Sequence, residues 1–128
     1  MAEQPAPKGS SVASDWWGKL TLEPLARAVG VWIDSRFPND SMLMRGLILG
    51  EEAGEVQRCI LKATQQVRGG ADYWDDQLPG ELVDVLIAVL GIAHRADIDI
   101  EHAIRRRWAE VEQRAYPTGD SGGGVTSG

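Results

Sequence analysis

Two pairs of acidic residues stand inside the most apolar part of the sequence. Glu52 and Glu55 are three residues apart, and so are Glu81 and Asp84. In a helix, residues at this spacing share a face, with Cβ atoms about 5–6 Å apart, so each pair points in one direction. The two residues on either side of Asp84 are apolar. We therefore expect Asp84 to lie out of bulk solvent.

Carboxylates gathered in an apolar environment need a compensating partner, because burying one without compensation costs several kcal/mol and four would repel one another. Protonation, basic side chains or a divalent cation can supply it. Basic residues are scarce nearby, since Arg58 and Lys62 lie further along the chain than Glu55. Oxygen ligands from several carboxylates suit Mg²⁺, or Mn²⁺ in its place. The spacing predicts a magnesium site with four ligands: Glu52, Glu55, Glu81 and Asp84.

Two other interpretations of the acidic pairs stand beside the magnesium site. In the first, the four carboxylates lie on exposed helix faces and pair with Arg or Lys of neighbouring helices. In the second, the chain is a di-iron carboxylate bundle, which requires Glu-x-x-His pairs on two helices. The residues three positions after Glu52 and Glu81 are both acidic, so di-iron chemistry is not favoured.

Apolar residues at spacings of three and four predict that helices position these acids, and alternating strand patterns are missing. The first helix spans about 22–36, with Thr21 as a possible cap. The second follows a stop and cap within 37–40 and reaches about Gln66. The third begins near Pro79, and the fourth is capped by Asp97 or Asp99. Residues 69–77 are expected to form a polar loop.

Four helices with short connections predict an all-α fold, an up-and-down four-helix bundle. The third helix is apolar nearly all round and should be central. Trp32 and Trp108 lie on apolar stripes and are expected in the core, and Cys59 is expected to be a small buried hydrophobe. About a hundred ordered residues bury a modest core, so we expect an oligomer, at least a homodimer.

Length and charge limit the classes of function. The 128 residues allow one domain, expected over 15–116 between disordered tails at 1–14 and 117–128. Thirteen Lys and Arg against nineteen Asp and Glu give a net charge of −6, which argues against a general nucleic-acid partner. No apolar run approaches the roughly 20 residues that span a bilayer. With no secretory signal and a single cysteine, a cytoplasmic protein without a membrane partner is expected.

The acidic residues also resemble the signature of a known family. Glu51-Glu52-Ala53-Gly54-Glu55 followed by Glu81-Leu82-Val83-Asp84 is similar to the E-E-x-x-E … E-x-x-D pattern of MazG-like nucleoside triphosphate pyrophosphohydrolases, the all-α NTP pyrophosphatases. The segments 47–61, 81–93 and 98–104 are similar to this family as well. The resemblance implies a magnesium-dependent four-helix enzyme, a homodimer or homotetramer, that cleaves a nucleoside triphosphate to the monophosphate and pyrophosphate.

Hydrolysis at the α-phosphorus requires neutralised phosphate charge, a water placed in line and a base. Glu55 and Glu51 are the candidates for orienting that water. The family commonly holds phosphates with Lys and Asn of its last helix, where this sequence offers Arg107 without a following Asn. Arg107 is therefore one candidate for phosphate binding. Arg95, near the end of the third predicted helix, is the other.

Aromatic residues outside the predicted helices are candidates for contacts with a nucleobase. Trp74, in the expected loop, is the preferred one, while Trp16 and Trp17 could shape a base pocket or a subunit interface. Two further functions remain open. One is a non-catalytic nucleotide- or protein-binding module on the same scaffold, and the other is an enzyme like phosphoribosyl-ATP pyrophosphohydrolase.

Overall fold

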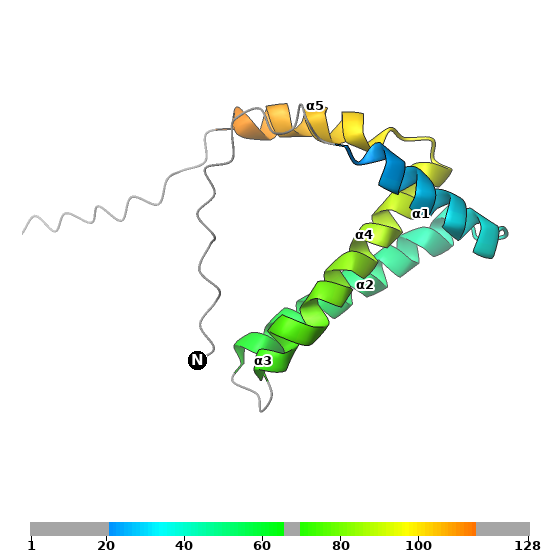
Figure 1. Ribbon diagram of the computed structural model, residues 1–128. Coiled ribbons are helices and arrows are strands. Elements are labelled where there is room, and N and C mark those ends of the chain that lie inside the picture. Colours follow the sequence, from blue (N-terminus) through cyan, green and yellow to red (C-terminus); the bar gives the residue numbers. More distant parts are fainter. Residues whose placement is uncertain (1–20, 66–69, 115–128) are drawn as a thin grey trace, which may run out of the picture.

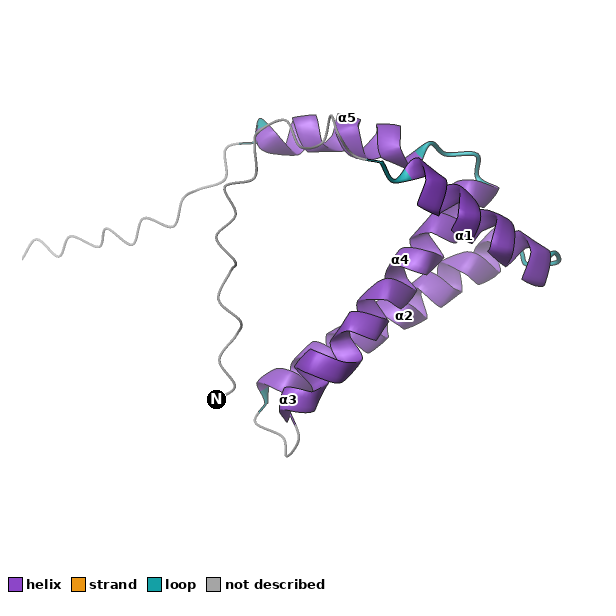
Figure 2. Ribbon diagram, in the orientation of Figure 1, coloured by secondary structure: helices purple, strands orange, loops and turns teal. Residues whose placement is uncertain are grey.

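The computed structural model describes residues 21–65 and 70–114, and all regular structure in these ranges is helical (Figure 2). The tails expected at 1–14 and 117–128, with Trp16 and Trp17, lie outside the described residues. The all-α prediction is confirmed for the part of the chain that is described. The main helices are α1 (Glu23–Arg36), α2 (Met42–Thr64), α4 (Leu78–Arg95) and α5 (Ile100–Glu112).

Local signals explain most of the helix boundaries. Ser41 Oγ accepts a hydrogen bond from the Met44 amide at 3.0 Å, and this caps the start of α2. The cap expected within 37–40 is therefore misplaced. Asp99 caps α5 by accepting from the His102 amide at 2.9 Å, and Pro79 lies in the first turn of α4, both as predicted.

The start of α1 is capped from another helix. Glu101 Oε1, on α5, accepts from the backbone amides of Leu22 at 2.6 Å and Glu23 at 3.2 Å. A helix N-terminus has amides without partners inside the helix, and a carboxylate there also interacts favourably with the helix dipole. The expected cap at Thr21 is wrong, because this contact between distant residues takes its place.

The expected loop is wrong for residues 70–77, which are helical. They form the short α3 (Gly70–Asp72) and the π-helix η2 (Tyr73–Gln77), which runs directly into α4. Contacts with α2 hold the segment in place. The Lys62 ammonium lies 5.3 Å from the centre of the Tyr73 ring, and the Cys59 thiol donates to the Tyr73 carbonyl at 3.2 Å. Cys59 is buried, as expected.

The helices form an open arrangement (Figure 1). The long helices α2 and α4 lie side by side and antiparallel, and α1 crosses them at one end. The central position expected for the third helix is confirmed, because α4 contacts α1, α2 and η2. Helix α5 projects away from the α2–α4 pair and packs chiefly on α1. One chain therefore does not form a closed up-and-down bundle over the described residues.

Small residues bring α1 close to α4. Ala26 and Gly30 are the buried positions of α1, and a Cβ atom at Gly30 would lie only 2.2 Å from His94 Cγ. The apolar stripe that predicted the helix supplies only part of this face: Val29 and Ile33 are partly buried, and Leu25 is exposed. Trp32, expected in the core, is 53% exposed, because the helix turns its small residues toward α4 instead.

Large apolar side chains remain exposed on the α2–α4 pair. Among the described residues, the buried hydrophobic core consists of Leu90 and four small residues, Ala26, Cys59, Ala63 and Ala93. The exposed side chains, here called the apolar face, include Leu43, Leu47 and Leu61 on α2 and Leu82, Val83 and Leu86 on α4. Because η2 extends α4, the helix Tyr73–Arg95 is 23 residues long and apolar enough to cross a membrane. That length was not foreseen, and only 17% of the most apolar 18-residue window of this helix is buried in the single chain.

Candidate metal centre and its adjoining cavities

Three carboxylates converge between α2 and α4. Glu52 lies near the middle of α2, and Glu81 and Asp84 lie one turn apart near the start of α4. One oxygen atom from each lies within 4.8 Å of the other two. Oxygens that share one octahedral Mg²⁺ ion are about 3 Å apart when adjacent and about 4 Å apart when opposite, so the three side chains would move closer together to share an ion. This set, here called the carboxylate cluster, can hold a hard divalent cation.

The surroundings of Glu52 disfavour the ionised form of its carboxyl group. Burial raises the pKa of this carboxyl above its ordinary value, and the negative charges of Asp84, Glu51 and Glu81 raise the pKa further. Loss of water and nearby like charges both disfavour the ionised form. A divalent cation at the carboxylate cluster would reverse the second effect, because it supplies positive charge where the carboxylates meet.

The remaining acidic residues depart from the expectation. Glu55 is not part of the carboxylate cluster, because its carboxylate pairs with Arg58 one turn further along α2. The prediction of Glu55 as a fourth ligand therefore does not match the geometry. Glu51 is exposed on α2, and Asp84 is also exposed in the single chain rather than withdrawn from solvent. The apolar neighbours of Asp84 in sequence belong to other faces of α4, and several of them are exposed too.

A mostly apolar cavity of about 340 Å³ adjoins the carboxylate cluster on the side toward α1. Glu52 and Asp84 form its acidic edge, and Trp32 and Phe37 belong to its wall. These two aromatic rings stand edge to face with their centres 6.5 Å apart. The volume falls within the range of small-molecule sites, about 300–1,000 Å³. We call this space the aromatic cavity; its other lining residues include Ile33, Met44, Ile48, Ile87 and Ala88.

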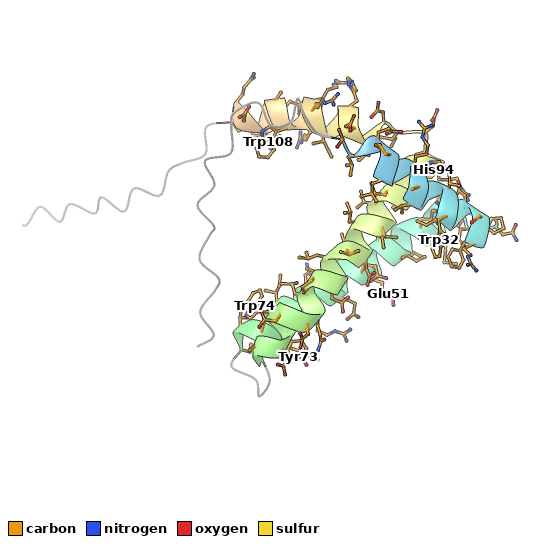
Figure 3. All side chains as sticks on the ribbon, in the orientation of Figure 1. Trp32, Glu51, Tyr73, Trp74, His94 and Trp108 are labelled. Atoms are coloured by element: carbon orange, nitrogen blue, oxygen red, sulfur yellow. The ribbon has the colours of Figure 1, made fainter. Side chains whose placement is uncertain are left out.

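A second, polar cavity of about 270 Å³ adjoins the carboxylate cluster on the side toward η2. Glu81 and Glu55 line it together with the cations Arg58 and Lys62. We call it the basic cavity. Figure 3 shows the two ends of the α2–α4 pair, with Trp32 on α1 at one end, Tyr73 of η2 at the other, and Glu51 between them on α2.

Arg95, predicted to bind substrate, is engaged in a structural network instead. Its guanidinium lies 3.1 Å from Asp34 Oδ1 and donates to the Asp40 carbonyl at 2.8 Å. Arg45 also donates to Asp34 Oδ1, at 2.7 Å, and to the Gly91 carbonyl at 2.9 Å. The hydrogen bond from Arg45, followed by that from Arg95, holds the pKa of Asp34 below its ordinary value.

The Asp34–Arg45–Arg95 network ties α1, α2 and α4 together, and sequence reasoning missed it. The Arg45 side chain is only 4% exposed and lines the aromatic cavity. A signal was present, because Arg45 interrupts an otherwise apolar stretch of α2 in the same way that Asp84 interrupts α4. Only the folded chain shows which acid it meets.

Two other predicted substrate residues lie away from the carboxylate cluster. Arg107, on the projecting helix α5, pairs with Glu110 at 2.9 Å. Trp74 lies in η2 and lines neither cavity, and Figure 3 shows it at the opposite end of the helix pair from Trp32. Trp32, rather than Trp74, therefore shares a cavity with Glu52 and Asp84. Trp108, expected in the core, is partly buried on α5.

Comparisons with protein-family models, with curated proteins and with solved structures find no significant match to this chain.

Proposed function

We propose that this chain is a magnesium-dependent nucleoside triphosphate pyrophosphohydrolase of the MazG-like kind. The observation that carries the proposal is the convergence of Glu52, Glu81 and Asp84 at the edge of a cavity with an aromatic wall. Three carboxylates suit a magnesium ion that retains waters and accepts phosphate oxygens. The aromatic cavity has the size and the chemistry to receive a nucleobase beside that ion.

Each acidic residue near the cavities has a separate role in this proposal. Glu52, Glu81 and Asp84 hold the ion. Bound Mg²⁺, or Mn²⁺ in its place, would neutralise phosphate charge and help to position a water molecule. Glu51 or Glu55 accepts a proton from the water that attacks the α-phosphorus. The bond from the α-phosphorus to the oxygen bridging to the β-phosphorus breaks, and pyrophosphate leaves.

Turnover of a nucleotide panel tests this function. We expect release of pyrophosphate from at least one of the eight common ribo- and deoxyribonucleoside triphosphates, dependent on Mg²⁺ and lost in the presence of a chelator. Phosphoribosyl-ATP belongs in the panel, since an enzyme like phosphoribosyl-ATP pyrophosphohydrolase would share the carboxylate cluster. Binding without turnover would support a non-catalytic nucleotide-binding module. A chain that neither binds nor hydrolyses any of these nucleotides would contradict the proposal.

We further propose that the apolar face of α2 and α4 is covered by a second copy of the chain, in a homodimer or homotetramer. The hydrophobic core of the described residues is small, and monomeric proteins rarely expose large contiguous apolar patches. A bilayer is a poorer partner, because it would have to accommodate the charges of Glu81 and Asp84 within the same helix.

Sedimentation velocity at micromolar concentration checks the assembly. We expect a species of at least twice the 13.9 kDa chain mass, and a shift toward monomer on Leu86→Glu, which places a charge on the apolar face. The exposed position Glu112→Gln on α5 serves as the control and should leave the mass unchanged. A stable monomer, or a chain that binds lipid vesicles instead, would contradict the second copy.

A further inference from the structure

The two cavities lie on opposite sides of the carboxylate cluster along the α2–α4 pair. On α2, the aromatic cavity uses positions before Glu52, such as Ile48, whereas the basic cavity uses positions after it, such as Arg58. On the antiparallel α4 the order is reversed: Ala88 faces the aromatic cavity and Gln77 the basic one. The pair therefore presents, in sequence, an apolar aromatic space, three carboxylates and a polar space with two cations.

We infer that the basic cavity holds the outer phosphates of the substrate, with Lys62 and Arg58 as the residues that bind them. This inference rests on the proposed function and fixes the direction in which the nucleotide lies. The base would occupy the aromatic cavity, the α-phosphate would meet the carboxylate cluster, and the β- and γ-phosphates would extend toward η2. Lys62 and Arg58 thus select triphosphates over monophosphates.

Charge supports this direction. Within the basic cavity, Arg58 is paired with Glu55, and Glu81 is shared with the carboxylate cluster. If Glu81 coordinates a cation, the charge of Lys62 is left without a carboxylate partner in that cavity. Lys62 is also held in position, because its ammonium lies 5.3 Å from the centre of the Tyr73 ring.

Arg95 and Arg107, the other candidates for phosphate binding, line neither of the two cavities beside the carboxylate cluster. Arg45 and Arg95 bind Asp34, at the α1 end of the helix pair. On α5, Arg105 pairs with Glu101 and Arg107 with Glu110. The phosphate-binding role that the sequence suggested for Arg95 and Arg107 therefore passes to residues one and two turns beyond Glu55 on α2.

Binding of uncleavable nucleotides tests the inference without relying on turnover. The probes are the α,β-methylene analogue of the best triphosphate substrate and the matching monophosphate, titrated calorimetrically in Mg²⁺. We expect Lys62→Met to weaken binding of the analogue about tenfold, the effect typical of one lost charge-assisted hydrogen bond, and to change monophosphate binding less than twofold. Arg58→Met should act in the same direction, and Lys62→Arg should restore most of the affinity.

Two controls fix the interpretation. Arg27→Met removes a surface arginine of α1 that is also paired with a glutamate on its own helix, and it should change neither affinity. Trp32→Ala should weaken the binding of both probes by a similar factor, because both carry the same base. If Lys62→Met lowered the affinity for both probes equally, or lowered neither affinity, the inference would be overturned while the proposed function stands. A wild-type chain that binds neither probe in Mg²⁺ would overturn both.

Discussion

Replacing one carboxylate of the cluster, as in Glu81→Gln, is expected to lower pyrophosphate release at least 10³-fold. The change keeps the size of the side chain and removes a negative charge from the place where three oxygens approach within 4.8 Å. Hard divalent cations depend on charged oxygen ligands, and the ion supplies much of the stabilisation of transferring phosphoryl groups. Steady-state rates at saturating substrate, measured across a Mg²⁺ titration, give the size of the loss.

Variants of the two neighbouring acids distinguish a role in metal binding from a role in catalysis. Glu51→Gln and Glu55→Gln should leave affinity for the metal nearly unchanged, because neither side chain belongs to the carboxylate cluster. Whichever of the two accepts the proton of the attacking water should lower turnover about 10²–10⁴-fold, the usual contribution of a general base. If both variants lost metal binding as fully as Glu81→Gln, the division of roles proposed for the acidic residues would be wrong.

Removing the carboxylate of Asp34 is expected to give the largest loss of stability. We predict that Asp34→Ala lowers the free energy of unfolding by about 2 kcal/mol, less than for a fully buried ion pair, because the Asp34 side chain is 34% exposed. The reason is that the Arg45 guanidinium, whose side chain is only 4% exposed, would lose its charged partner. Denaturant unfolding followed by circular dichroism measures the loss.

Matched variants show whether that loss comes from the unpaired cation. Arg27→Ala breaks an exposed pair on α1, where the expected cost is below about 1 kcal/mol. The double variant Asp34→Ala/Arg45→Met removes both charges of the pair, so it should cost less than the sum of the single changes. A simple sum would mean that the two side chains act independently.

Acid should weaken the same network. The pKa of Asp34 is lowered in the folded chain, first by the hydrogen bond from Arg45 and then by Arg95, relative to an ordinary value of 3.8. A carboxyl whose folded pKa is depressed stabilises the fold above its unfolded pKa, and this contribution is lost as the pH falls through the folded pKa. The difference in stability between wild type and Asp34→Ala should thus shrink as the pH falls below about pH 4. A constant difference down to pH 3 would contradict this account.

Sequence periodicity located the four long helices well, because caps and apolar spacing are local signals. Asp99 and Pro79 mark helix starts through contacts within their own first turns, and these predictions are confirmed. Contacts between distant residues could not be foreseen in the same way. Glu101 caps a helix that begins 78 residues earlier in the chain, and η2 is helical where Tyr73 packs against α2.

The candidate site shows the same division. The spacing of Glu81 and Asp84 placed both on one face of α4, and their approach to Glu52 follows from the antiparallel pairing with α2. Glu55 could not be assigned from spacing, because the pairing of its carboxylate with Arg58 competes with any role at the carboxylate cluster. The role of Arg95 depends on Asp34, which lies 61 residues earlier in the chain, and no local pattern indicates that the two side chains meet.

Calorimetric titration of the nucleotide-free chain with Mn²⁺ and with Mg²⁺ tests the central claim, that Glu52, Glu81 and Asp84 together bind a divalent cation. The account predicts saturable binding by the wild-type chain, weakened at least tenfold in Glu81→Gln and unchanged in Glu112→Gln. It also predicts weaker binding in acid, because protons compete for the same carboxylates. Equal heats for wild type and Glu81→Gln, with or without a nucleotide present, would contradict it.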